Sequence, residues 1–184
     1  MPVFNWPNII SGARLLLAPA VAYLLSREAY GAALTVFAAA GASDALDGYL
    51  ARRLGQTTRL GAALDAAADK LMILSSVVML AWLSLLPPWL AFTLLARDGL
   101  MLAGAMACRL AAGSLTVAPS LPGKIHTALE FVVISVVLAQ TAALINASDW
   151  LPQLFVLVFL SALASGLHDA LSRGRQAGNR PRTG

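Results

Sequence analysis

The sequence DALDGYLARRLGQTTRLGAALDAAAD, residues Asp44–Asp69, decides how this chain folds. Four of the nine acidic residues of the whole chain lie in this stretch, at positions 44, 47, 65 and 69. Asp44 and Asp47 are three residues apart, and Asp65 and Asp69 are four apart, so each pair shares one face of a helix. The short link between the pairs makes their helices antiparallel neighbours. The stretch therefore predicts two helices that bring four carboxylates together.

The composition of the whole chain is that of a membrane protein. Of 184 residues, 59% are hydrophobic and only 12% are charged, and the mean hydropathy is +0.75. Soluble domains carry about 25% charged residues. These values exclude a disordered chain and argue against a soluble globular enzyme, and they predict a polytopic membrane protein.

Six apolar stretches are long enough to cross a bilayer, which takes about 20 residues each. We therefore predict an all-α fold with six transmembrane helices. Residues 1–172 would form one domain with a short interfacial segment at the N-terminus, and residues 173–184 a basic cytoplasmic tail. The predicted spans are Ile9–Leu25, Ala29–Leu50, Gly61–Leu86, Trp89–Leu110, Gly123–Ile145 and Leu151–Leu171.

The basic residues predict the orientation of these spans. They gather in the second and fourth links and in the tail, and such residues stay on the cytoplasmic side. Both termini and the acidic stretch are therefore predicted to be cytoplasmic. The net charge of +4 is explained by topology and by contact with anionic lipid, and no nucleic acid partner is expected. The residues concerned are Arg52, Arg53, Arg59, Arg109, Lys124, Arg173, Arg175, Arg180 and Arg182.

Four carboxylates at close range need protons or cations to neutralise them. Oxygen ligands at this density suit Mg²⁺, Mn²⁺ or Ca²⁺, and two divalent ions would balance four charges and suit phosphoryl-type displacement. Gly48 and Gly61 would let a nucleotide approach the backbone, and Arg52 could pair with its phosphate. Two alternatives are a polar contact between helices and an ion-conducting or metal-transport pathway. A pathway is disfavoured because only Asp98 and Glu130 remain as further acids at depth.

The spacing Asp44-x2-Asp47-Gly48-x2-Ala51-Arg52-x8-Gly61-x3-Asp65-x3-Asp69 resembles the signature of the CDP-alcohol phosphatidyltransferase family. The resemblance extends to Asp69-Lys70 and to Arg97-Asp98. It implies a six-helix homodimer in a membrane, here the bacterial inner membrane, with a cytoplasmic cavity. Members of this family transfer the phosphatidyl group of a CDP-linked donor to an alcohol and release CMP.

The resemblance also implies the roles of individual residues. Asp69 resembles the general base that takes the proton of the acceptor hydroxyl. The ligands of two Mg²⁺ or Mn²⁺ ions would be Asp44, Asp47, Asp65 and Asp69. The surface that binds CDP-diacylglycerol would comprise Asn8, Asp47, Gly48, Ala51, Arg52, Gly61 and Asp65.

The acceptor alcohol is predicted from the second half of the chain. The resemblance is greatest to members that form cardiolipin from CDP-diacylglycerol and phosphatidylglycerol, because Arg97 is followed by Asp98. The alternative acceptor is glycerol 3-phosphate, whose enzymes typically have Arg-Glu there. Both groups have a Lys-x-x-Thr element, matched by Lys124 and Thr127. The predicted acceptor-binding residues are Arg97, Asp98, Arg109, Lys124, His126 and Thr127.

Overall fold

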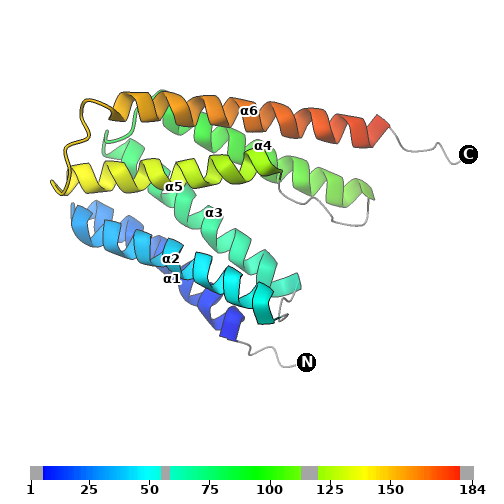
Figure 1. Ribbon diagram of the computed structural model, residues 1–184, viewed down its shortest axis with the longest axis horizontal. Helices are drawn as coiled ribbons and strands as arrows, with labels where there is room; N and C mark the ends of the chain where they lie inside the picture. The colour runs from blue at the N-terminus through cyan, green and yellow to red at the C-terminus, as the bar shows by residue number, and fades with distance from the viewer. Residues whose placement is uncertain (1–5, 55–58, 113–119, 179–184) are drawn as a thin grey trace, which may run out of the picture.

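The computed structural model describes residues 6–54, 59–112 and 120–178, with the side chains of residues 16–43, 68–104, 106 and 120–172. The described residues form six α-helices and no strand, which confirms the all-α prediction for this part of the chain (Figure 1). The helices are α1 (Trp6–Ser26), α2 (Tyr30–Leu54), α3 (Arg59–Trp82), α4 (Pro88–Ala112), α5 (Leu121–Thr141) and α6 (Leu151–Gly178).

Consecutive helices are joined at one end of the bundle, on the left in Figure 1, by three short connections. We call this the turn end. Each connection has one non-glycine residue with a left-handed backbone: Glu28 (φ 56°), Ser84 (φ 57°) and Ala143 (φ 56°). The following N–H in each case bonds to the carbonyl five residues earlier, the Schellman ending of a helix. These bonds are Ala29 N to Leu24 O (3.0 Å), Leu85 N to Leu80 O (2.9 Å) and Leu144 N to Ala139 O (2.9 Å).

Two predicted span ends are corrected by these turns. The third span was predicted to reach Leu86 and the fifth to reach Ile145, because the apolar run continues that far. The helices end at Trp82 and Thr141 instead. A left-handed residue cannot continue a right-handed helix, so the last apolar residues of both runs lie in the turns.

The helices pack around an apolar core that lies toward the turn end. Helix α1 packs on α3 and α2, α5 packs between α2 and α6, and α4 packs on α6 and α3. Core residues recur at three- and four-residue intervals, so each helix buries one stripe. The fully buried large side chains of this core include Leu25, Phe37, Leu80, Leu90, Leu94, Ile134 and Leu138.

The outer surface of the described helices is also apolar. Trp82 is 83% exposed and Phe92 is 74% exposed, and many leucines on α4 and α6 are similarly open. Surfaces of this kind face lipid. By length and composition, two helices among the described residues could cross a membrane, Leu121–Thr141 and Leu151–Ser172. These features are those of a membrane protein.

Candidate active site

A cavity of about 610 Å³ lies between α2, α3 and α5, and Asp69 lies in its wall. We call it the Asp69 cavity. Asp69 is half-buried and comes from the first half of α3. Lys124 and Thr127, from the first turns of α5, share the cavity with it. The remaining lining residues are Ala38, Gly41, Ala42, Met72, Ile73, Ala128, Phe131 and Val132.

The polar residues at the start of α5 face two different parts of the molecule. Ser120 is the N-cap, and its side-chain oxygen accepts a hydrogen bond from the Gly123 N–H at 3.2 Å. Such a cap satisfies one of the free N–H groups of the first turn. Lys124 is exposed, whereas His126 is fully buried. Lys124 therefore belongs to the Asp69 cavity, and His126 belongs to the interior of the bundle.

The apolar wall of the cavity depends on a glycine. Phe131 on α5 stacks on Phe37 of α2, with ring centroids 4.7 Å apart and an interplanar angle of 16°. A Cβ atom on Gly41 would clash with the Phe131 ring. The missing side chain at Gly41 therefore allows the ring to pack against α2.

Beside the cavity lies an ion cluster on α3, α4 and α5, formed by the half-buried Lys70 and by the buried Arg97, Asp98, His126 and Glu130. The Lys70 ammonium is 2.5 Å from Asp98 Oδ2 and 3.8 Å from Glu130 Oε2. Arg97 Nη1 donates to Asp98 Oδ1 at 2.8 Å. Two cations therefore face two carboxylates, which is the balance that buried charges require.

Helix α6 completes the cluster with two serines. Arg97 Nε donates to Ser165 Oγ at 3.2 Å, and His126 Nδ1 lies 2.8 Å from Ser161 Oγ. The Ser161 hydroxyl donates its own proton to the Val158 carbonyl at 2.7 Å. The hydrogen-bond network thus assigns the donating proton to His126 Nδ1. This leaves His126 Nε2 facing Glu130 Oε1 at 3.5 Å.

Three members of the cluster could hold a metal ion by geometry alone. Asp98, His126 and Glu130 each offer a ligand atom, and these atoms lie within 4.8 Å of one another. The Lys70 ammonium, however, already lies against both carboxylates. A metal ion bound here would compete with that ammonium, so the cluster as it stands is better described as a lysine-centred ion network.

The structure divides the predicted site residues into three groups. It brings Asp69, Lys124 and Thr127 into one cavity. It places Arg97, Asp98 and His126 in the ion cluster, which is joined to the cavity because Lys70 follows Asp69 in the chain. The side chains of a third group lie outside the described residues: Asn8, Asp44, Asp47, Gly48, Ala51, Arg52, Gly61, Asp65 and Arg109.

The helix positions of the signature residues are nevertheless described. Asp44 and Asp47 belong to the second half of α2, and Gly61 and Asp65 belong to the first turns of α3. Helix α2 ends at Leu54 and α3 begins at Arg59, so a short link connects the two. We call the bundle end with this link and the start of α5 the site end.

Several residues of the ion cluster were not predicted as site residues. They are Lys70, Ser161 and Ser165. A sequence signal for most of them exists, because polar residues four apart share a helix face. His126 and Glu130 have this spacing on α5, and Ser161, Ser165 and Asp169 have it on the otherwise apolar α6.

These observations define a class of molecule. It is an all-α membrane protein with an aspartate and a lysine in one cavity and with further aspartates on α2 and α3. The family model described as CDP-alcohol phosphatidyltransferase matches residues 4–165 of the chain. The chain belongs to this family.

Curated relatives of the chain have two kinds of name. A cardiolipin synthase (CMP-forming) of Streptomyces coelicolor is 47% identical over 106 residues, which cover 54% of this chain and 49% of that protein. The human cardiolipin synthase (CMP-forming) is 42% identical over 98 residues, which cover 53% of this chain and 33% of that protein. A CDP-diacylglycerol--glycerol-3-phosphate 3-phosphatidyltransferase of Pseudomonas fluorescens is 49% identical over 90 residues, which cover 44% of this chain and 46% of that protein. The matches span less than half the length of each of these relatives.

Proposed function

We propose that this protein transfers the phosphatidyl group of CDP-diacylglycerol to phosphatidylglycerol, giving cardiolipin and CMP. The acceptor hydroxyl oxygen attacks the phosphorus that carries the diacylglycerol. The bond from this phosphorus to the bridging oxygen of the pyrophosphate breaks, and CMP leaves with that oxygen. The hydroxyl proton passes to a carboxylate of the protein.

The observation that carries this proposal is the Asp69 cavity. Asp69 has the position of the general base in the family signature, and it shares the cavity with Lys124 and Thr127. An alcohol is a weak nucleophile, so a carboxylate in place to take its proton is needed. Lys124 at the same cavity would attract the anionic phosphate of the acceptor.

Divalent metal ions fit the donor set of this site. The family signature has four carboxylates on α2 and α3, and oxygen donors are the ligands that Mg²⁺ and Mn²⁺ prefer. We propose that two such ions are held by Asp44, Asp47, Asp65 and Asp69. When bound, they would neutralise the pyrophosphate and the charge on the leaving CMP.

We propose that CDP-diacylglycerol binds over the end of α2 and the start of α3. A glycine exposes its backbone to a ligand and an arginine pairs with phosphate, which suits Gly48, Gly61 and Arg52. The proposed CDP surface comprises Asn8, Asp47, Gly48, Ala51, Arg52, Gly61 and Asp65.

We propose that Lys124, Thr127 and Arg109 bind the acceptor directly. Arg97, Asp98 and His126 remain predicted acceptor residues, and their place in the ion cluster supports a contribution through Lys70, which follows Asp69 in the chain.

We further propose that all six helices cross the bacterial inner membrane, with both termini and the site end in the cytoplasm. The exposed apolar side chains on α4 and α6 and the tryptophans at helix ends support this topology. Residues 1–172 would form the enzyme domain, residues 173–184 the cytoplasmic tail, and two copies a homodimer.

The acceptor is tested by CMP release. The purified protein in detergent is given CDP-diacylglycerol, Mg²⁺ or Mn²⁺, and either phosphatidylglycerol or glycerol 3-phosphate. We expect CMP and cardiolipin with phosphatidylglycerol. CMP release with glycerol 3-phosphate alone would establish the alternative activity, which the Pseudomonas fluorescens relative favours. Absence of CMP with either alcohol would overturn the enzyme proposal.

A further inference from the structure

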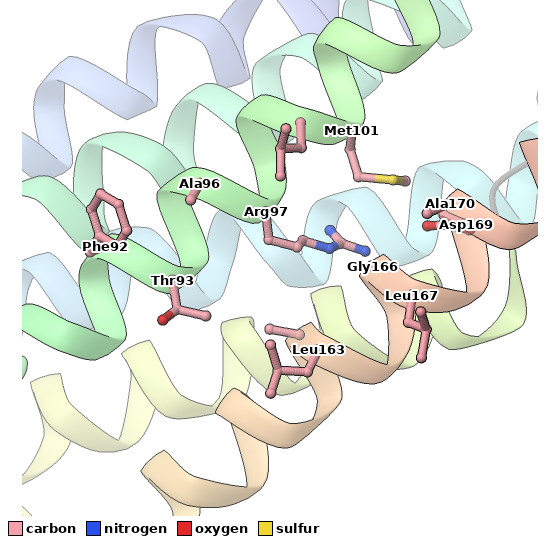
Figure 2. A pocket seen from close by; sticks show the side chains of 12 residues that line it. Phe92, Thr93, Ala96, Arg97, Met101, Leu163, Gly166, Leu167, Asp169 and Ala170 are labelled. Atoms are coloured by element: carbon pink, nitrogen blue, oxygen red, sulfur yellow. The ribbon is translucent and has the colours of Figure 1, made fainter.

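A second cavity, about 680 Å³ in volume, forms a groove between α4 and α6 (Figure 2). It has no described lining residue in common with the Asp69 cavity. Its walls are mainly apolar, and several of its side chains are more than half exposed. They include Phe92, Leu100, Leu163 and Leu167. A groove of this composition on the outer surface of a membrane protein fits an acyl chain.

Two polar side chains of opposite charge interrupt the apolar wall. Arg97 extends from α4 towards α6, where Asp169 is located (Figure 2). The two residues are only 7% and 8% exposed. Within the part of the chain that the structure describes, Arg97 Nη2 and Asp169 Oδ2 have no hydrogen-bond partner. A buried polar atom left unpaired is unfavourable, and more so when it is charged.

The unpaired donor, Arg97 Nη2, and the unpaired acceptor, Asp169 Oδ2, both lie near Gly123. A Cβ atom on Gly123 would lie 3.5 Å from Arg97 Nη2 and 3.9 Å from Asp169 Oδ2. The two charged groups nevertheless do not pair with each other. One small polar head group placed between them could therefore accept from the guanidinium and donate to the carboxylate.

The charges of the pair select the chemistry of that head group. A phosphate accepts from a guanidinium, and an ammonium donates to a carboxylate. Only an ammonium both donates to Asp169 Oδ2 and offsets its negative charge, and a choline group has no N–H to donate. We propose that the α4–α6 groove binds a zwitterionic phospholipid with a primary ammonium, of the phosphatidylethanolamine type, with its phosphate on Arg97 and its ammonium on Asp169.

The depth of the pair along α6 agrees with a lipid head group. At 1.5 Å per residue, Asp169 lies about 27 Å from Leu151 along the helix axis. The hydrocarbon core of a bilayer is about 30 Å thick, and Trp150 next to Leu151 is of the type found at an interface. Asp169 therefore lies near the opposite interface, and the acyl chains would run back past Leu167 and Leu163.

The lipid site does not rest on the proposed reaction, and its test does not use CMP release. The full chain is purified in detergent and equilibrated with mixed micelles of dioleoyl phosphatidylethanolamine, phosphatidylcholine or phosphatidylglycerol. Bound lipid is counted by native mass spectrometry. We expect one phosphatidylethanolamine retained per chain, and at least tenfold weaker retention of the phosphatidylcholine with the same acyl chains.

Two glycines provide a matched pair of variants. A Cβ atom on Gly166 or on Gly99 would meet nothing within 4 Å, so both positions accept a larger side chain. Gly166 lines the groove and Gly99 does not. Gly166→Leu should reduce retained phosphatidylethanolamine at least tenfold, whereas Gly99→Leu should retain it as the wild-type protein does. Asp169→Asn should abolish the preference for phosphatidylethanolamine over phosphatidylcholine.

If Gly166→Leu fails to fold, the wild-type protein is photo-cross-linked to a phosphatidylethanolamine that has a diazirine in one acyl chain. Its cross-links should map to Phe92–Met101 and Ala162–Ala170. Cross-links confined to other segments would overturn the proposal. Equal retention of phosphatidylethanolamine and phosphatidylcholine by the wild-type protein would overturn it as well, as would equal retention by Gly166→Leu and Gly99→Leu.

Discussion

At the turn end, three helix pairs close through tight Schellman turns over leucines that are fully buried, such as Leu25, Leu80 and Leu138. At the site end, the same helices surround a cavity and a cluster of buried charges. His126 Nε2 and both oxygens of Glu130 have no hydrogen-bond partner there among the described residues. Buried polar atoms of this kind lower stability and are retained where they serve binding or chemistry. We infer that the turn end mainly stabilises the fold, and that the site end is less stable because its buried polar groups serve function.

The largest expected effect is at the site end. Asp69→Asn should lower the rate of CMP release by about 10²- to 10⁴-fold, because the amide cannot accept the hydroxyl proton. Binding of CDP-diacylglycerol should largely survive, since the substitution is nearly isosteric. Turnover is measured as CMP release and binding as co-purified lipid. Asp149→Asn is the matched control, because Asp149 is an exposed aspartate at the turn end.

The same pair of measurements separates two roles of Asp69. If Asp69→Asn lost CDP-diacylglycerol binding and turnover to the same extent, Asp69 would act as a metal ligand alone. A rate equal to that of Asp149→Asn would show that Asp69 has no part in the reaction.

The second expected effect is on stability, from the ion cluster. Lys70→Met should lower the free energy of unfolding by about 3–5 kcal/mol, because it leaves Asp98 and Glu130 without the ammonium between them. Unfolding is followed by circular dichroism during titration with sodium dodecyl sulfate. The double variant Lys70→Met/Glu130→Gln should recover part of this loss, because it removes the uncompensated carboxylate. A double variant less stable than Lys70→Met would contradict the pairing.

The cluster also makes a prediction about metals. With the ammonium gone in Lys70→Met, the ligand atoms of Asp98, His126 and Glu130 remain within reach of one ion. A carboxylate and imidazole set of this kind suits Zn²⁺ or Mn²⁺. With Mg²⁺ present at saturation in both samples, Zn²⁺ should therefore raise the melting temperature of Lys70→Met more than that of the wild-type protein. Equal stabilisation of both proteins would show that Lys70 does not exclude the ion.

A smaller effect is expected where the Asp69 cavity borders the apolar core. Gly41→Ala should lower the free energy of unfolding by about 1–3 kcal/mol, because the new Cβ would force the Phe131 ring to move. Gly31→Ala is the matched control on the same helix, since its Cβ would meet only Ala142 Cβ at 4.0 Å. That change should be neutral or stabilising because alanine favours a helix. Equal destabilisation by both changes would show that the contact with Phe131 is unimportant.

The same contrast explains what the sequence could and could not predict. The all-α fold follows from six apolar runs, and the assignment of Asp69, Lys124 and Thr127 to one site follows from the resemblance to the family. The ion cluster depends on how α3, α4, α5 and α6 are rotated against one another. No local pattern sets that rotation, so the contact of Lys70 with Asp98 and Glu130 was not predicted. The helix ends at Trp82 and Thr141 were also missed, because the left-handed residues that follow them, Ser84 and Ala143, are not the glycine that usually marks such a turn.

The smallest expected effect lies at the turn end and concerns Ala143. A left-handed residue with a Cβ costs about 1–2 kcal/mol, and glycine avoids that cost while it increases the freedom of the unfolded chain. Ala143→Gly should therefore raise the free energy of unfolding by about 0.5–1 kcal/mol. Ala142→Gly is the matched control, because Ala142 has a φ of −75° and gains nothing from glycine. If the turn end serves only stability, Ala143→Gly should leave the rate of CMP release unchanged, and a changed rate would mean that the two ends are coupled through α5.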